Sequence, residues 1–231
     1  MPNKEWLSRT EALLGENAVE KLENARIIIF GVGGVGGYAF EALVRSGIKN
    51  IAVVDSDTVS ESNLNRQIIA TRSTLGKLKV EAARERALDI NPDAKITVYP
   101  LFYSEETENE ISLGDYDYII DAIDSVASKL RLIENAAKHG TMIISSMGAG
   151  NKLNPMGFKV ADIYKTSVCP LARAIRTELK KRGIKKLKCI YSEEAPARVQ
   201  QGRRAPASIA TVPSAAGLAI AAEVIRDIIS K

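Results

Sequence analysis

Short runs of apolar residues alternate with longer segments of helical periodicity over the first 150 residues. Each run is apolar at every position and rich in β-branched side chains, which is typical of a strand buried on both faces of a parallel sheet. The expected strands are 27–30, 51–54, 96–99, 118–120 and 142–144, and the expected helices between them are 38–46, 77–89 and 127–138. This order predicts parallel strands joined by helical crossovers.

A helical pattern also opens the chain. Its apolar side chains are spaced for one face of a single helix that ends before Ala25: Trp6, Leu7, Leu13, Leu14, Val19 and Leu22. Such spacing predicts that these side chains all pack against the rest of the protein.

The rhythm changes after Gly150. Residues 158–163 alternate apolar and polar side chains, which predicts a half-solvated antiparallel strand. Further on we expect a helix over 170–182 with Pro170 in its first turn, a strand over 187–191, a loop over 194–207 and a core helix over 209–225. The fold class is therefore α/β, a Rossmann-type, doubly wound and mainly parallel sheet with an antiparallel extension in the C-terminal third.

Length and composition narrow the class of protein. A chain of 231 residues is shorter than the roughly 250–300 residues at which one core splits, so we expect a single domain over 1–231. The mean hydropathy is −0.06, and the longest apolar stretch is interrupted by Pro213 and Gly217, so no membrane partner is expected. The chain opens without a secretory signal pattern, which predicts a cytoplasmic protein.

Charge and cysteine content are also informative. Residues 161–231 carry 14 of the 32 Lys and Arg but only 6 of the 28 Asp and Glu, which leaves 18 and 22 for residues 1–160. A cationic last third favours a polyanionic partner. The two cysteines, Cys169 and Cys189, are too few for a disulfide framework or a four-cysteine zinc site.

A glycine-rich turn follows the first expected strand. Gly31, Gly33, Gly34 and Gly36 fit G-x-G-x-x-G between a strand and a helix, where glycines allow a tight turn and a phosphate meets the helix N-terminus. Tyr38 follows the glycines instead of the Lys-Ser/Thr pair of a P-loop. The motif therefore predicts a nucleotide site of the Rossmann kind.

Acidic residues follow the second strand. Asp55 closes it, where a carboxylate accepts hydrogen bonds from the ribose of NAD or ATP alike. Asp57 is either a second nucleotide ligand or an acidic turn residue. The sequence up to this point leaves both nucleotides open.

Two cations and a second pair of acidic residues distinguish between ATP and NAD as the expected ligand. Arg66, within the segment 55–67, and Lys79 would neutralise charge on a leaving pyrophosphate, whereas a dehydrogenase has no obvious use for them. Asp121 and Asp124 end the fourth strand, and one of these carboxylates is a candidate ligand for Mg²⁺. The pattern therefore favours ATP and Mg²⁺ over NAD.

These motifs together resemble the ubiquitin-activating-enzyme-like superfamily, which includes the bacterial molybdopterin and thiamine sulfur-carrier adenylating enzymes. The resemblance covers residues 5–150, and it implies that these residues bind ATP while 151–231 bind the acceptor. It implies that Asp55 holds the ribose and that Asn63, Arg66 and Lys79 contact the triphosphate. Asp124 would bind Mg²⁺.

The resemblance also concerns the opening helix. Arg9 looks like the arginine that members of the superfamily supply across a dimer interface to the ATP of the other subunit. It implies a homodimer in which Arg9 joins Arg66 and Lys79 as a catalytic residue. An ordinary exposed helical arginine is the alternative.

Residues 148–194 point to one branch. The segments that carry this likeness resemble the tRNA threonylcarbamoyladenosine dehydratase family: 148–155, 160–166, 170–173 and 189–194. The likeness implies that ATP activates the carboxylate of threonylcarbamoyladenosine in tRNA, followed by ring closure with loss of water. The rival branch adenylates the C-terminal glycine of a small ubiquitin-like sulfur carrier, but its usual pair of Cys-x-x-Cys motifs is absent from the sequence. A non-catalytic nucleotide-binding module is a further alternative.

The basic stretch bears on the partner. Between 173 and 188 eight cations face the single acid Glu178, which favours a phosphate backbone over a merely solvated helix face. Arg198, Arg203 and Arg204 add to it, so tRNA is the expected partner. Cys189 is either a nucleophile or an inert core residue. A monovalent cation and a cysteine desulfurase or sulfur acceptor are further candidate ligands and partners.

Overall fold

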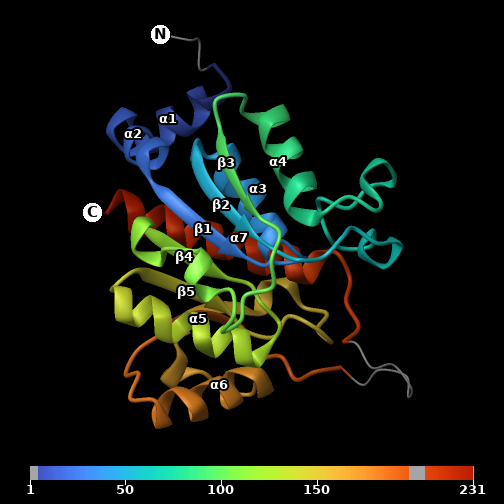
Figure 1. Ribbon diagram of the computed structural model, residues 1–231, viewed down its shortest axis with the longest axis vertical. Helices are drawn as coiled ribbons and strands as arrows, with labels where there is room; N and C mark the ends of the chain where they lie inside the picture. The colour runs from blue at the N-terminus through green and yellow to red at the C-terminus, as the bar shows by residue number, and fades with distance from the viewer. Residues whose placement is uncertain (1–4, 198–205, 231) are drawn as a thin grey trace.

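The protein is built on one seven-stranded sheet (Figure 1). The computed structural model describes residues 5–197 and 206–230. The strands are β1 Arg26–Phe30, β2 Asn50–Val54, β3 Lys95–Tyr99, β4 Tyr118–Asp121, β5 Met142–Ser146, β6 Phe158–Asp162 and β7 Lys188–Ser192. Their order is β3-β2-β1-β4-β5-β7-β6, and every neighbouring pair is parallel except β6 with β7. This arrangement confirms the expected fold class.

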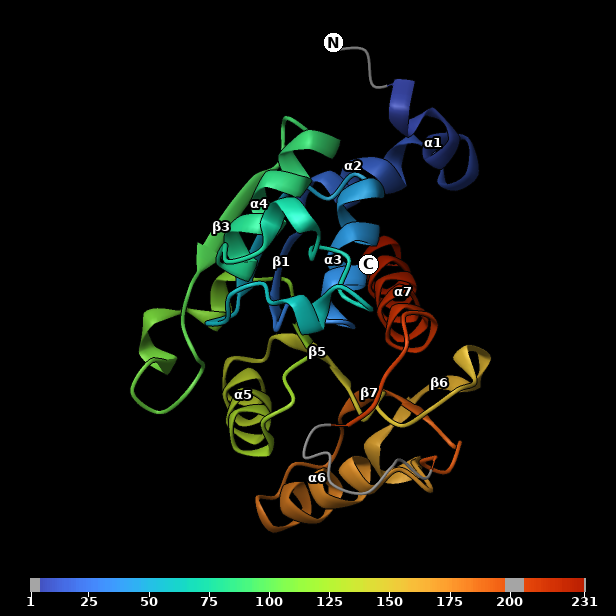
Figure 2. The same ribbon diagram turned by 90° about the vertical axis from the view of Figure 1, so that its right-hand side faces the viewer.

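Helices cover both faces of the sheet. The helices are α1 Ser8–Leu14, α2 Glu16–Asn24, α3 Gly36–Arg45, α4 Lys79–Ile90, α5 Val126–His139, α6 Pro170–Lys181 and α7 Thr211–Ile229. One face packs on α2, α3, α4 and α7, and the other on α5 and α6 (Figure 2).

Strand β1 shows why the chain needs cover on both faces. Ile27 and Ile29 belong to the cluster with α3 and α7, whereas Ile28 and Phe30 belong to the cluster with α5. All four side chains are fully buried, and each contributes about 1.5–3 kcal/mol by leaving water. An all-apolar strand therefore belongs at the centre of the sheet.

Helix α7 closely approaches the start of α3, beside the glycine-rich turn. A Cβ atom on Gly217 would lie 2.3 Å from the Val35 carbonyl oxygen, so only glycine lets the two helices meet at this distance. The same approach sets Pro213 against the glycine-rich turn, 3.1 Å from where a Cβ on Gly34 would stand. Helix α7 runs four residues beyond the expected end at 225.

The opening segment differs from the expectation of one helix. Gly15 adopts a φ of 86° and divides it into α1 and α2. Leu7, Val19 and Leu22 are buried, but the side chains of Trp6 and Leu13 are 44% and 83% exposed. The prediction of one apolar face was wrong here, because the chain turns at Gly15 and the segment is not one continuous helix.

The remaining expectations can be compared directly. The strands and helices begin and end within a few residues of their expected positions, and β6 pairs antiparallel with β7. Residues 198–205 of the expected loop, with Arg198, Arg203 and Arg204, lie outside the described residues. Within the described ranges no helix is long and apolar enough to cross a membrane.

Candidate active site

A crevice opens at the carboxyl ends of β1, β2 and β4, where neighbouring connections leave the sheet in opposite directions. Its cavity has a volume of about 450 Å³, within the range of small-molecule sites. The glycine-rich turn, the ends of β2 and β4, the segment 63–67 and the residues before α7 form its walls. Open α/β sheets bind ligands at this topological position.

The glycine-rich turn is held by close backbone contacts. Gly31 has a φ of +86°, and a Cβ there would lie 2.8 Å from the Ala122 carbonyl oxygen. A Cβ on Gly36 would come within 1.8 Å of the Gly31 carbonyl oxygen, which fixes the start of α3 against the turn. Gly33 and Gly34 line the cavity. The N-terminus of α3 therefore offers N–H groups to an anion in the crevice.

The carboxylate of Asp55 is positioned by backbone donors. The N–H groups of Val32 and Asp57 each donate to it at 2.9 Å, and the Lys79 ammonium lies 3.8 Å away. Burial raises the pKa of Asp55 above its usual value, although Lys79 and the two N–H donors oppose this shift. The group is thus held at the end of β2 in the wall of the cavity, and its contact with a ribose stays a prediction.

Lys79 and Asp57 form an ion pair at the wall of the crevice. The Lys79 Nζ donates to Asp57 Oδ2 at 2.6 Å. The Lys79 side chain is 7% exposed and that of Asp57 67% exposed. Asp57 is therefore the ion-pair partner of Lys79. It also lines the cavity, and its direct contact with a nucleotide remains a prediction.

Segment 60–66 brings two polar side chains to the crevice. Asn63 accepts from the Ser60 N–H at 3.1 Å and so closes a short 3₁₀ turn. Arg66 is held by the Ser62 carbonyl at 2.8 Å and the Asn65 side chain at 2.9 Å. Both Asn63 and Arg66 line the cavity.

Gln67 is a site residue that the sequence analysis did not single out. It is buried and lines the cavity, and its Oε1 has no partner among the residues that the structure describes. Buried polar atoms are normally hydrogen-bonded, so an acceptor without a partner beside the cavity marks Gln67 as a candidate site residue. The signal was present in the sequence, since Gln67 ends the quoted segment 55–67.

The two carboxylates at the end of β4 have different surroundings. Asp121 is fully buried. The Lys129 ammonium donates to it at 2.8 Å, and the Ser145 hydroxyl donates a second hydrogen bond. Asp124 is exposed at the cavity wall, with no hydrogen bond to the rest of the described chain. Of the two candidates for Mg²⁺, only Asp124 is therefore accessible.

Asp124 is suited to bind Mg²⁺ as a single carboxylate ligand, together with water and substrate phosphates. In the described residues there is no group of three or more His, Cys, Asp and Glu that could hold a metal. Mg²⁺ usually keeps several waters and takes one or two carboxylates together with substrate phosphates. A single exposed carboxylate beside a nucleotide crevice agrees with that chemistry.

Arg9 and the cysteines lie elsewhere. Arg9 is exposed on α1, which lies near the start of β1, whereas the crevice lies at its end (Figure 1). It does not line the cavity of its own chain as described. Cys189 is fully buried in β7, and burial raises its pKa to about 12. A thiol in that state is not a nucleophile at neutral pH, which favours the core interpretation.

A second cavity of about 380 Å³ adjoins the first. The two share Asp124, Ala149 and Gly150 in their walls. Much of the rest of the second cavity is formed by residues 146–152 and 169–171, at the end of β5 and the start of α6. The crevice thus continues from a nucleotide-sized compartment into a neighbouring one.

The basic stretch serves two purposes. Arg176 donates to the carbonyl and hydroxyl of Thr166, at 2.8 and 2.7 Å, and Lys188 is paired with Glu223 and Asp227, at 2.9 and 2.7 Å. These two cations support the fold, so counting them toward a phosphate-binding surface was wrong. Lys181 and Arg182 are each paired with a glutamate at 2.6 Å.

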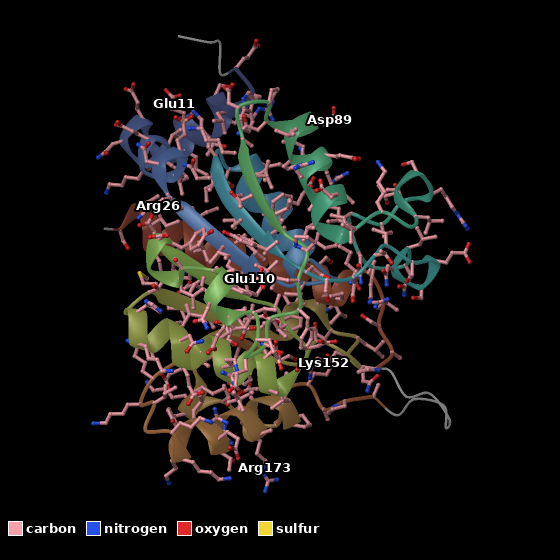
Figure 3. All side chains as sticks on the ribbon, viewed as in Figure 1. Glu11, Arg26, Asp89, Glu110, Lys152 and Arg173 are labelled. Carbon is pink, nitrogen blue, oxygen red and sulfur yellow. The ribbon has the colours of Figure 1, made fainter. Side chains whose placement is uncertain are left out.

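Four cations of the stretch are exposed and have no ion-pair partner among the described residues. We call them the basic face: Arg173, Lys180, Lys185 and Lys186. They lie on α6 and in the turn that follows it, and Figure 3 shows Arg173 on the outer side of this helix.

The fold and the crevice are those of a Rossmann-type nucleotide-binding protein, with cations and an accessible carboxylate in the same cavity as the glycine-rich turn. Comparison with known families identifies the branch: residues 7–231 match the ThiF family, and the chain belongs to this family.

Relatives with named activities agree with each other. The chain is 40% identical to the tRNA threonylcarbamoyladenosine dehydratase of Bacillus subtilis (strain 168), over 96% of this chain and 94% of that protein. It also resembles crystal structures of E. coli tRNA N6-threonylcarbamoyladenosine dehydratase, TcdA, in complex with AMP (TM-score 0.92) and with ATP (TM-score 0.90). Both are 32% identical, and the match covers 98% of this chain and 95% of the other.

Proposed function

We propose that this protein uses ATP to activate the carboxylate of threonylcarbamoyladenosine in tRNA and closes it into a cyclic form with loss of water. The relatives named above support the substrate. The observation that carries the proposal is the junction of the two cavities at Asp124 and Gly150. It lets a carboxylate in the second compartment meet the α-phosphate of a nucleotide in the first.

The reaction follows from that arrangement. A carboxylate oxygen attacks the α-phosphorus and pyrophosphate leaves, which yields an acyl-adenylate. A nucleophile of the same threonylcarbamoyl group then attacks the acyl carbon, and AMP leaves with the former carboxylate oxygen. The second step is intramolecular, and high effective molarity favours it without a covalent enzyme intermediate.

Each site residue has a proposed role. Asp55 accepts the ribose hydroxyls, and the α3 N-terminus and Asn63 contact the phosphates. Arg66 and Lys79 stabilise the negative charge that grows on pyrophosphate as it leaves. Lys79 is paired with Asp57 in the structure. To contact the triphosphate, the Lys79 ammonium must either bind it together with Asp57 or leave Asp57. Mg²⁺, held by Asp124, would supply further charge neutralisation at the phosphates.

The proposed assembly is a homodimer. Arg9 lies outside the crevice of its own chain, and a second subunit would be needed to bring it to an ATP. Sedimentation of the protein tests the assembly. Turnover of Arg9→Ala, measured alone and after mixing with Arg66→Ala, tests whether one subunit completes the site of the other. Recovery of activity in the mixture would support sharing of the site across the interface.

The proposed partner is tRNA, bound through its phosphates to the basic face. Helix α6 begins at the second cavity, where Pro170 and Leu171 form part of the wall. The basic face therefore extends from the compartment that would receive the modified nucleoside. A cytoplasmic location, a monovalent cation and a sulfur-transfer partner stay predictions.

Release of pyrophosphate tests the proposal. It should depend on tRNA that carries threonylcarbamoyladenosine and should be absent with the same tRNA lacking the modification. The sulfur-carrier alternative is not favoured, because the relatives that match along most of the chain are named for the tRNA reaction. Release driven by a small protein with a C-terminal glycine, and not by modified tRNA, would reverse this preference.

A further inference from the structure

The wall of the second cavity contains a buried lysine that the ATP chemistry does not use. The side chain of Lys152 is only 4% exposed, and Figure 3 places it beside the loops at the crevice end of the sheet. Its Nζ donates to the backbone carbonyl of Glu194. An ammonium has three N–H donors, and only one of them has a hydrogen-bond partner within the described chain.

Lys152 differs from the other buried lysines. Three lysines in the described chain are buried, and two of them are neutralised: Lys79 by Asp57 at 2.6 Å and Lys129 by Asp121 at 2.8 Å. No carboxylate of the described chain lies within 4.0 Å of the Lys152 ammonium. Burying an unpaired charge is unfavourable by several kcal/mol, so this ammonium is suited to an incoming anion.

The carboxylate of Glu194 is hydrogen-bonded to backbone groups. The two carboxylate oxygens of Glu194 accept the N–H groups of Leu153 at 2.8 Å and Asn154 at 3.0 Å. Those bonds fix the segment that follows Lys152. The carboxylate of Glu194 therefore holds the loop in place, and it attracts the Lys152 ammonium only at longer range, without a direct ion pair.

The loop around Lys152 is strained and pinned. Asn151 has a φ of 57°, and its side-chain Oδ1 accepts the Ala207 N–H at 2.7 Å. Val168, at a φ of 61°, directly precedes Cys169 in the wall of the same cavity. They are the only non-glycine residues with positive φ in the described ranges, and such strain persists where function requires a fixed geometry.

We propose that Lys152 binds the carboxylate of the acceptor and holds it in the second cavity for attack on the α-phosphorus. This inference rests on the proposed function and names the group that recognises its substrate. Lys152 lines only the second cavity, whereas Arg66 and Lys79 line only the first. The phosphates have their own cations, and the carboxylate is the anion left for Lys152.

The chemistry suits a single lysine. An ammonium is a compact point charge, so it binds one carboxylate oxygen and leaves the other free to attack phosphorus. Lys152 forms and breaks no covalent bond in this step. Its role is to position the acceptor and to select an anionic group, so a nucleoside that lacks the carboxylate should not be held.

Kinetics of two substitutions at Lys152 and one control variant test the inference. Lys152→Met keeps the length of the side chain without its charge, Lys152→Arg keeps the charge, and Lys138→Met, on the exposed side of α5, controls for loss of a lysine. We expect Lys152→Met to lower kcat/KM for tRNA carrying threonylcarbamoyladenosine by roughly tenfold or more. Lys152→Arg should retain more activity, and Lys138→Met should match the wild type.

Three further measurements separate this role from others. The Kd for ATP, the Kd for tRNA lacking the modification and the midpoint of thermal unfolding should not change in Lys152→Met. A weaker ATP Kd with an unchanged KM for modified tRNA would overturn the inference in favour of a nucleotide contact. Equal losses in all parameters with a lower midpoint would show a structural role and overturn it as well. A wild-type protein without turnover would instead refute the proposed function, and the inference with it.

Discussion

Removal of the Lys129 ammonium should strongly destabilise the protein. Lys129 and Asp121 are both fully buried, and their charged atoms lie 2.8 Å apart. The ammonium also donates to the Ser146 carbonyl at 3.0 Å and so links α5 to the end of β5. In Lys129→Met the carboxylate of Asp121 would remain buried without its cation.

The size of the effect follows from this burial. Loss of one partner of a buried pair costs about 3–5 kcal/mol. Asp121 keeps the Ser145 hydroxyl and the Ile123 N–H, the latter at 3.1 Å, which places the expected loss near the lower end of that range. In the double variant Lys129→Met/Asp121→Asn no charge is left unpaired, so at least about 1 kcal/mol should be recovered relative to Lys129→Met.

Urea unfolding of the wild type and both variants measures these differences, provided that the slope with urea is unchanged. The reasoning would be refuted if Lys129→Met lost less than about 1 kcal/mol, or if the double variant were no more stable than the single one. The pair also bears on the site, because Asp121 accepts the Ile123 N–H in the loop that carries Asp124. Lys129→Met should therefore lower turnover in the fraction that remains folded.

The other predictions concern single steps of the account. Asp124→Ala should abolish Mg²⁺-dependent turnover and Mg²⁺-enhanced ATP binding, with unchanged unfolding, because the side chain is exposed; normal turnover with Mg²⁺ would contradict the metal assignment. Arg66→Ala should lower kcat by at least about tenfold, or about 1.4 kcal/mol, with a smaller change in the ATP Kd; a defect in Kd alone would place Arg66 in ground-state binding. The triple variant Lys180→Glu/Lys185→Glu/Lys186→Glu reverses the charge of the exposed lysines of the basic face. The slope of log affinity for tRNA against log salt concentration should become less steep by roughly 0.7–0.9 for each lost contact. An unchanged slope would show that this face does not contact tRNA. Cys189→Ala should keep its turnover, because burial holds the thiol protonated with a pKa of about 12; a folded but inactive variant would show that the thiol is needed.

Much of the sheet was predictable from local pattern. Strands such as Ile27–Phe30 are apolar at every position, and only a central parallel strand has use for that pattern. The turn at Gly31 and the carboxylate of Asp55 were predictable for a related reason, since both stand directly at strand ends. Parallel strands bring their carboxyl ends to one edge, so sequence position alone indicates that these groups meet.

Partners of charged side chains were not predictable in this way. Lys129 lies in a regular helical pattern, and nothing local shows that α5 carries its ammonium to Asp121. Lys188 and Arg176 resemble the neighbouring cations in sequence, but tertiary packing places them against Asp227 and Thr166. Local sequence gives the charge of a residue, whereas its burial depends on elements far away in the chain.

Lys152 shows the same limit at the site itself. Its burial depends on the strained loop at Asn151 and on Glu194, some forty positions later in the chain. At the start of the chain the limit is local, because the turn at Gly15 divides the expected helix, and spacing along a single helix then no longer predicts whether Trp6 and Leu13 are exposed.

Mass spectrometry of tRNA nucleosides tests the central claim most directly. tRNA that carries threonylcarbamoyladenosine is incubated with the protein, ATP and Mg²⁺, digested and compared with a sample that lacks ATP. The account predicts that the threonylcarbamoyladenosine peak is replaced by a product lighter by one water molecule, in step with release of AMP and pyrophosphate. An unchanged nucleoside in the presence of folded, ATP-binding protein would contradict it.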